Sequence, residues 1–155
     1  MVSNEEISVN KRNGRGKESL NIEKIHSMVG FATEGITGVS ASHVEMNSGI
    51  QFFDGITTED IQQILIKSAN DLITLESPNY QYVAARLLLF SLRKRLFHRL
   101  WEHPKFLDHI KSCIEKGMYD KDILVNYTEA EIDRLNGFID HERDYNFTYA
   151  GLRQV

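Results

Sequence analysis

The chain has 155 residues, the length of one ordinary domain or of one small domain with the start of another. Hydrophobic residues at 41% and charged residues at 26% are typical of a globular protein and argue against disorder. The single Cys113 excludes an internal disulfide and a multi-cysteine zinc site. With no signal peptide and no apolar run long enough for a bilayer, the sequence predicts a cytoplasmic protein that does not bind membranes.

The chain opens with a pattern that predicts a β-hairpin. Apolar and polar residues alternate over residues 7–10, and Asn13-Gly14 tolerates the positive φ angles of a tight turn. Leu20 and its neighbours offer a short return strand. The tip of this hairpin is basic although the net charge of the chain is -4. Its basic residues are Lys11, Arg12, Arg15 and Lys17.

From Asn21 the spacing of apolar residues becomes helical. The first predicted helix covers residues 22–32, with Asn21 as its N-cap and Gly35 after its end. A second helix is predicted after Ser40, and a third begins at Thr57-Thr58-Glu59-Asp60. The fourth, predicted from about Asn79 to Trp101 after Ser77-Pro78, is apolar on nearly all sides and should be the central buried element.

Beyond Pro104 the sequence predicts shorter, acidic helices, so we place a soft boundary near residues 101–104. One helix should carry its apolar face over residues 106–114 and end at Gly117. Thr128 and Glu131 form a capping-box pattern before a helix expected to include residues 132–139. The last residues, "FTYAGLRQV", stop without a capping signal, which suggests a fragment of a longer protein.

The residues alone support little chemistry. Lys and Arg in a Gly-rich turn can bind phosphate, but the Walker spacing is missing and a solvated turn explains the same residues. A second basic cluster, residues 93–95, also fits ordinary stabilisation of a helix C-terminus. No spacing of the six histidines predicts a metal site, the segment 141–144 is expected to be a solvated helix end, and no catalytic triad can be argued.

Several stretches together resemble a known family. They are "VNKRNG", "LNIEKIH", "FFDGITTEDIQQILIKSA", "SPNYQYVAARLLLFSLRK" and "HERDYNFTYAGLRQ". In order and spacing they are similar to the N-terminus of the large (alpha) subunit of class I ribonucleotide reductase. The resemblance implies a mostly α fold: residues 1–101 as an ATP-cone, a four-helix bundle capped by a β-hairpin, and residues 102–155 as the helical lead-in to an α/β barrel. The catalytic residues would lie beyond Val155, so the resemblance implies part of an enzyme without its catalyst.

In that family the cone is the site of overall activity control, which binds ATP or dATP with Mg²⁺. The resemblance implies that Lys11, Arg12 and Lys94 bind the phosphates, with the hydroxyl and helix N-terminus of Thr58 beside them. Glu18 and Asn21 match groups that face the adenine edge, and Lys24 matches another polar contact. The apolar wall is expected from Val9, Ile25, Ile61 and Phe90. The implied partners are the rest of the alpha subunit, or a separate catalytic alpha chain, and the beta subunit.

The sequence departs from the family at two places. The turn between Lys11 and Glu18 is one residue longer than expected, and Gln62 and Ser91 stand where dATP-inhibited members often have histidines. An alternative is therefore a degenerate cone that docks on another subunit without binding nucleotide. A nucleic-acid-binding repressor, combining a cone with a zinc ribbon, is disfavoured by the acidic balance and the single cysteine.

Overall fold

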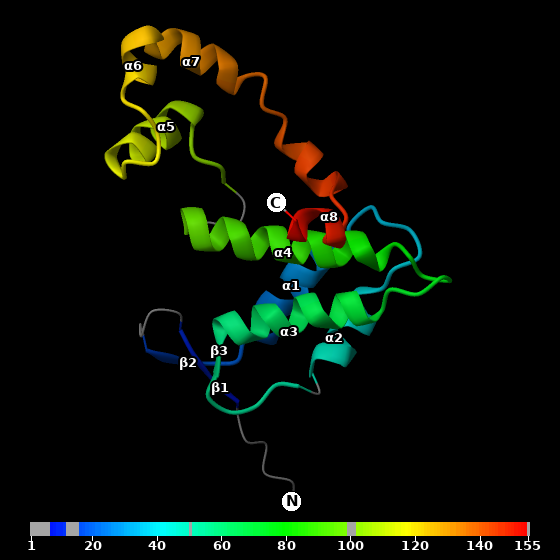
Figure 1. Ribbon diagram of the computed structural model, residues 1–155. Helices are drawn as coiled ribbons and strands as arrows, with labels where there is room; N and C mark the ends of the chain where they lie inside the picture. Colours follow the sequence, from blue (N-terminus) through cyan, green and yellow to red (C-terminus); the bar gives the residue numbers. More distant parts are fainter. Residues whose placement is uncertain (1–6, 12–15, 50, 99–101, 155) are drawn as a thin grey trace, which may run out of the picture. The chain divides into compact units, whose positions relative to one another are not determined.

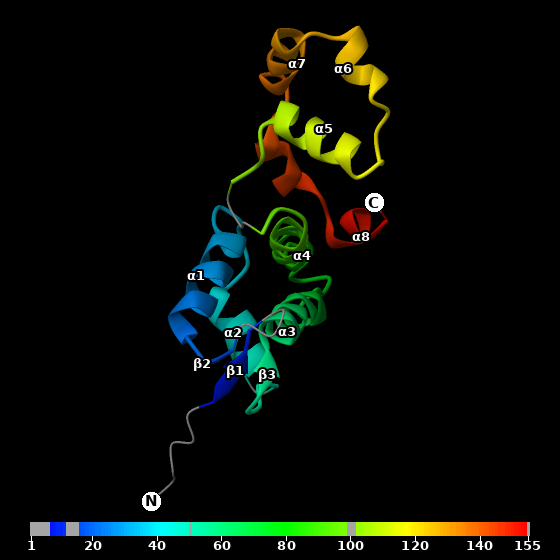
Figure 2. The same cartoon turned by 90° about the vertical axis from the view of Figure 1, so that its left-hand side faces the viewer.

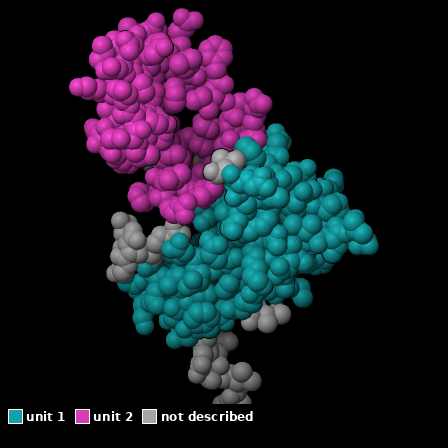
Figure 3. Space-filling view, viewed as in Figure 1, with its two compact units in different colours: residues 1–91, 145–155 teal, residues 92–144 magenta. Residues whose placement is uncertain are grey.

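The computed structural model describes every residue except 1–6, 12–15, 50, 99–101 and 155. Its contacts divide the chain into two compact units, residues 1–91 with 145–155 and residues 92–144 (Figure 3). The described part is mostly helical with one small sheet, as the sequence predicts. None of its helices is both long and apolar enough to cross a membrane. The predicted end of a regulatory domain near residues 101–104 stays a prediction.

The sheet of the first unit has three strands, β1 (Ser8–Asn10), β2 (Lys17–Ser19) and β3 (Ile56–Thr57) (Figure 1). The central β1 pairs antiparallel with β2, which confirms the strand pairing of the predicted hairpin, whereas its predicted turn at Asn13-Gly14 lies outside the described residues. On its other side β1 pairs parallel with β3, which the sequence analysis missed. Asp54 fixes this junction, since its Oδ1 accepts both the backbone N–H of Ser8 (2.8 Å) and its hydroxyl (2.7 Å). These two hydrogen bonds hold the pKa of Asp54 below its ordinary value.

Helices α1 (Ile22–Thr33) and α2 (Ala41–Gly49) follow the hairpin and confirm the prediction for this stretch. Asn21 is the N-cap of α1, because its side-chain oxygen accepts the N–H of Lys24 at 3.0 Å. Gly35, with φ +70°, follows the end of the helix, in the left-handed conformation that glycine adopts without strain.

Helix α3 (Thr58–Asp71) begins with a reciprocal capping box between Thr57 and Asp60, as its sequence predicts. Helix α4 (Tyr80–Phe97) starts within one residue of the predicted Asn79 and ends earlier than the predicted Trp101, which lies outside the described residues. The helix opens with a tighter turn, because the first hydrogen bonds, to the carbonyls of Pro78 and Asn79, span three residues. The middle of α4 is buried as predicted; its buried apolar residues are Val83, Ala84, Ala85, Leu87, Leu89 and Phe90.

The chain returns to the first unit with α8 (Tyr149–Arg153), which lies beside α4 in both views (Figures 1 and 2). Leu152 of α8 is buried. The guanidinium of Arg86 lies 5.3 Å from the ring centre of Tyr145, a cation–π contact that joins α4 to the start of this return segment.

The second unit contains α5 (Phe106–Glu115), α6 (Asp122–Asn126) and α7 (Glu129–Asn136). Its small core joins Leu107 and Ile110 of α5 to Ile132 of α7. The capping box at Thr128 is present as predicted. The helix it opens is shorter than expected, because it ends at Asn136 with Gly137 as C-cap. Residues 138–139 therefore lie beyond it and are exposed.

The segment that follows α7 is also different from the prediction. Residues His141–Asn146 form a 3₁₀ helix, η2, rather than a solvated helix end. Asp144 within it accepts a hydrogen bond from Nη2 of Arg93 at 3.0 Å, and the Arg93 side chain is only 4% exposed. A buried guanidinium needs such a partner, which explains why this acidic residue is not simply solvated.

Candidate functional site

The register of the sheet places Glu18 on the same face as two core residues. Val9 on β1 lies opposite Glu18 on β2 and opposite Ile56 on β3. Side chains at paired positions lie on one face of a sheet, and Val9 and Ile56 are 3% and 0% exposed. Glu18 therefore shares the core-facing side of the sheet, at its β2 edge, whereas Lys17 belongs to the opposite face.

Two lysines lie next to the Glu18 carboxylate. Nζ of Lys11 is 2.9 Å from one carboxylate oxygen, and Nζ of Lys24 from α1 is 3.6 Å from the other. The hydrogen bond from Lys11 is the main cause that holds the pKa of Glu18 below its ordinary value, against partial burial and with help from both lysine charges. Glu18 is therefore an ionised hydrogen-bond acceptor at neutral pH. Together with Lys11 and Lys24, it forms one cluster of three predicted site residues.

The parallel pairing of β1 and β3 brings the start of α3 to this cluster's end of the sheet. Asn10, the last residue of β1, lies opposite Thr57, the N-cap of α3. Lys11 and Thr58 are the next residues on the two neighbouring segments. The N-terminus of a helix carries partial positive charge and unpaired N–H donors, both favourable for an anion. Lys11 therefore follows the end of β1, and the N-terminus of α3 follows the end of the adjacent strand β3.

The predicted apolar wall is made of residues that are all buried in the first unit. Their exposed fractions are 3% for Val9, 7% for Ile25, 8% for Ile61 and 1% for Phe90. Asn21 is also accounted for locally, because its side-chain oxygen caps α1; its amide nitrogen is the group left to act as a donor.

Four further residues were singled out by the sequence: Arg12, Lys94, Gln62 and Ser91. Arg12 lies outside the described residues. Lys94 is on α4 one turn after Phe90, and residues four apart share a helix face; by its contacts it belongs to the second unit. Gln62 and Ser91 are both buried, and the Gln62 amide donates to the backbone oxygen of Leu87 at 3.0 Å, which links α3 to α4.

The sequence analysis missed Asp54 and β3, although both position the site. A signal for them was present, since Asp54-Gly55 is a turn dipeptide and Gly55 adopts φ +79°. The partner strand of so short a segment cannot be read from its two residues, because Ile56 pairs with Val9 far along the chain.

A model of the ATP cone domain matches residues 7–95. The chain belongs to the ATP-cone family. The matched region runs from β1 almost to the end of α4 and contains every predicted nucleotide-site residue from Val9 to Lys94.

Relatives of the ATP-cone chain are alpha subunits of ribonucleoside-diphosphate reductase. It is 45% identical over 98% of its length to ribonucleoside-diphosphate reductase 1 subunit alpha of Escherichia coli K12, and 42% identical over 96% to the alpha subunit of Enterobacteria phage T4. The alpha subunit of Helicobacter pylori is 40% identical over 96% of this chain. These matches cover 20%, 19% and 18% of the relatives, so the chain spans about a fifth of their length.

Proposed function

We propose that this ATP-cone binds ATP or dATP and controls the overall activity of a ribonucleoside-diphosphate reductase alpha subunit. The observation that carries the proposal is the parallel β1–β3 pairing, which puts Lys11 beside the N-terminus of α3, with Glu18 in register on the core-facing side of the sheet. In this reading α1–α4 are the bundle of the cone, residues 1–101 are the regulatory domain, and residues 102–155 lead into a catalytic α/β barrel.

The two ends of the ligand need different chemistry. A triphosphate needs concentrated donors and positive charge, which Lys11, Arg12 and Lys94 supply together with the hydroxyl and N–H of Thr58. Mg²⁺ would neutralise part of the phosphate charge. The carboxylate of Glu18 accepts from the exocyclic amine of adenine, whereas guanine presents a carbonyl oxygen there, so Glu18 selects adenine. Asn21 and Lys24 would add polar contacts beside it.

Titration calorimetry with ATP, dATP and GTP tests this proposal. We expect heat with both adenine nucleotides and at least about tenfold weaker binding of GTP, the size of one discriminating hydrogen bond. Lys11→Met should weaken ATP binding, and Glu18→Ala should reduce the preference for ATP over GTP. Lys17→Met is the matched control, since Lys17 is in the same hairpin but on the other face of the sheet. A folded chain without heat, or equal effects of the two lysine variants, would refute nucleotide binding here.

A second candidate function is subunit docking by a cone that no longer binds nucleotide. It is favoured by Gln62, whose buried amide is occupied by the backbone of α4, at a position where inhibited members often have histidine. Size-exclusion chromatography with a catalytic alpha chain and with the beta subunit separates the two functions. Assembly that is the same with and without ATP, in a chain that gives no calorimetric heat, would support docking alone.

A further inference from the structure

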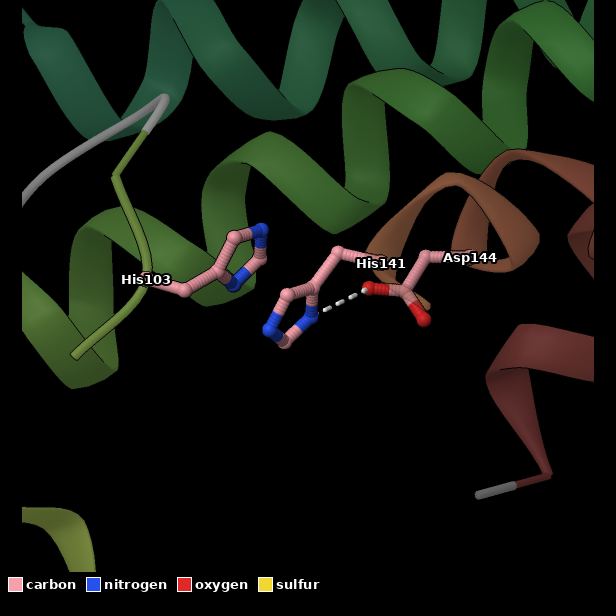
Figure 4. A group of neighbouring side chains, drawn as sticks. All are labelled: His103, His141 and Asp144. Atoms are coloured by element: carbon pink, nitrogen blue, oxygen red, sulfur yellow. Dashed lines mark ion pairs between the residues drawn. The ribbon is translucent and has the colours of Figure 1, made fainter. Parts of the chain in front are cut away.

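A group of potential metal ligands occurs within the second unit, and none of its members belongs to the proposed nucleotide site. His103 comes from the non-helical segment before α5, and His141 and Asp144 come from η2 (Figure 4). One ligand atom from each residue lies within 4.8 Å of the others, and all three side chains are partly buried. The sequence predicts no metal site because no spacing of its histidines matches a metal-binding motif. Such motifs cannot detect ligands that the fold brings together from two separate segments.

We propose that His103, His141 and Asp144 bind a divalent first-row transition metal ion, with Zn²⁺ as the best candidate. Two imidazoles and a carboxylate are a common protein donor set for such ions, with further positions left for water. Donors around zinc lie about 2.0–2.2 Å from the ion, so donors of one site stand within about 4 Å of each other. The 4.8 Å spread therefore needs only side-chain adjustment.

Arg93 orients one of the three ligands. Its Nη2 donates to Oδ2 of Asp144 at 3.0 Å; the same oxygen is 3.8 Å from Nδ1 of His141 and retains a second lone pair for an ion. Carboxylates that bind metals are commonly held by such outer hydrogen bonds. The positive charge of the guanidinium weakens the binding of hard cations, which are held mainly by electrostatic attraction. The site should therefore prefer ions that bind imidazole strongly, such as Zn²⁺, over Mg²⁺ or Ca²⁺.

The present arrangement of the two rings shows what must change on binding. The rings of His103 and His141 are stacked, with centroids 3.5 Å apart and planes within 2°. The nitrogen lone pairs lie in the plane of each ring. In two stacked, parallel rings these planes are separate, so one ring must turn before both rings can bind the same ion. His103 is the ring expected to turn, because it lies outside any helix. Both rings line a pocket of about 110 Å³, which gives the space for this movement.

Metal binding to the full chain, stripped of metal with a chelator, tests the proposal. We expect Co²⁺ to give visible absorption bands and Zn²⁺ to displace it, while millimolar Mg²⁺ does not. His103→Ala and His141→Ala should each weaken Zn²⁺ binding by at least about tenfold, the lower limit for loss of even an outer-shell group. His98→Asn is the control: His98 is exposed in the same unit, and asparagine tolerates its φ of +58°.

NMR of the histidine side chains gives a second measurement. Zn²⁺ should shift the ring signals of His103 and His141 and leave that of His98 in place. The proposal is overturned if the wild-type chain binds Zn²⁺ no better than His103→Ala, or if the shifts fall on other histidines. Circular dichroism establishes that each variant is folded, and His103→Ala decides the outcome if a change in η2 impairs folding. Nucleotide binding can fail or succeed without affecting this result.

Discussion

Gln62 offers a direct measure of what holds α3 against α4. Its side chain is 3% exposed and donates to the backbone oxygen of Leu87 at 3.0 Å. Replacement by methionine keeps a straight side chain of similar length and removes the donor. The Leu87 carbonyl keeps its own bond within α4, so no buried acceptor is left wholly unpaired. The expected loss is therefore that of one hydrogen bond, about 1 kcal/mol in the free energy of unfolding.

Replacement of Gln62 by alanine removes the same hydrogen bond and also leaves a cavity. The lost side-chain atoms include one methylene, which contributes about 0.8 kcal/mol, and the amide group, whose removal leaves the cavity. Gln62→Ala should therefore lower the free energy of unfolding by about 2–3 kcal/mol. The expected order of decreasing stability is therefore wild type, Gln62→Met and Gln62→Ala.

Urea unfolding followed by far-UV circular dichroism measures both losses. Gln63, exposed on the same helix, supplies the matched controls Gln63→Met and Gln63→Ala, which should stay within about 0.5 kcal/mol of wild type. A Gln62→Met variant as stable as its control would show that the buried hydrogen bond contributes nothing. Equal losses in Gln62→Met and Gln62→Ala would show that packing contributes nothing, and either result would refute the reasoning.

Lys11→Met should raise the pKa of Glu18 toward its ordinary value, measured by NMR titration of the carboxyl carbon; an unchanged pKa would contradict the ion pair. Because the folded pKa is lowered, the contribution of Glu18 to stability is present above its unfolded pKa and is lost as pH falls through the folded one. Thr57→Ala, which breaks the capping box, should cost about 1 kcal/mol in urea unfolding. Thr58→Ala should keep the free energy of unfolding within about 0.5 kcal/mol of wild type and should weaken ATP binding. If Thr58→Ala lowered stability while Thr57→Ala weakened ATP binding, the roles of the two threonines would be exchanged. Tyr80→Phe should cost about 1–2 kcal/mol by calorimetric melting, because the buried Tyr80 hydroxyl accepts a backbone N–H at 3.0 Å; no change in melting would exclude that bond.

The helices were predictable where local signals agreed. Asn21 at the start of α1 and Thr128 at the start of α7 each combine a capping side chain with the onset of helical spacing, and both caps are present. The end of α7 was not predictable, because Phe138 and Ile139 continue the apolar spacing past the point where Gly137 ends the helix. The spacing of the apolar residues predicts that the helix continues, whereas Gly137 predicts that it ends, and these two signals disagree here.

The site could be predicted only as a set of residue types. The hairpin itself was readable from the alternation over residues 7–10 and from Asn13-Gly14. Its register, which brings Lys11 to Glu18, was not, because the turn between them is one residue longer than the family pattern. The neighbour on the other side of β1 is a two-residue strand whose partner is far along the chain, and no local pattern specifies such a pairing. The same reason applies to the histidines: His103 and His141 come together through the fold, with no spacing between them to read.

The ion pairs of Glu18 bear on how a nucleotide would enter. Lys11 and Lys24 both lie against this carboxylate in the ligand-free chain, and the Lys11 and Glu18 side chains are 44% and 32% exposed. Ion pairs this exposed contribute little to stability, so Lys11 can exchange a carboxylate for a phosphate at little cost. In the proposed complex, Lys24 would remain beside Glu18 after the exchange, and the ionised carboxylate would accept from the adenine amine. In the proposed site, the cluster would therefore hold the charged groups near the positions that a nucleotide requires without opposing its entry.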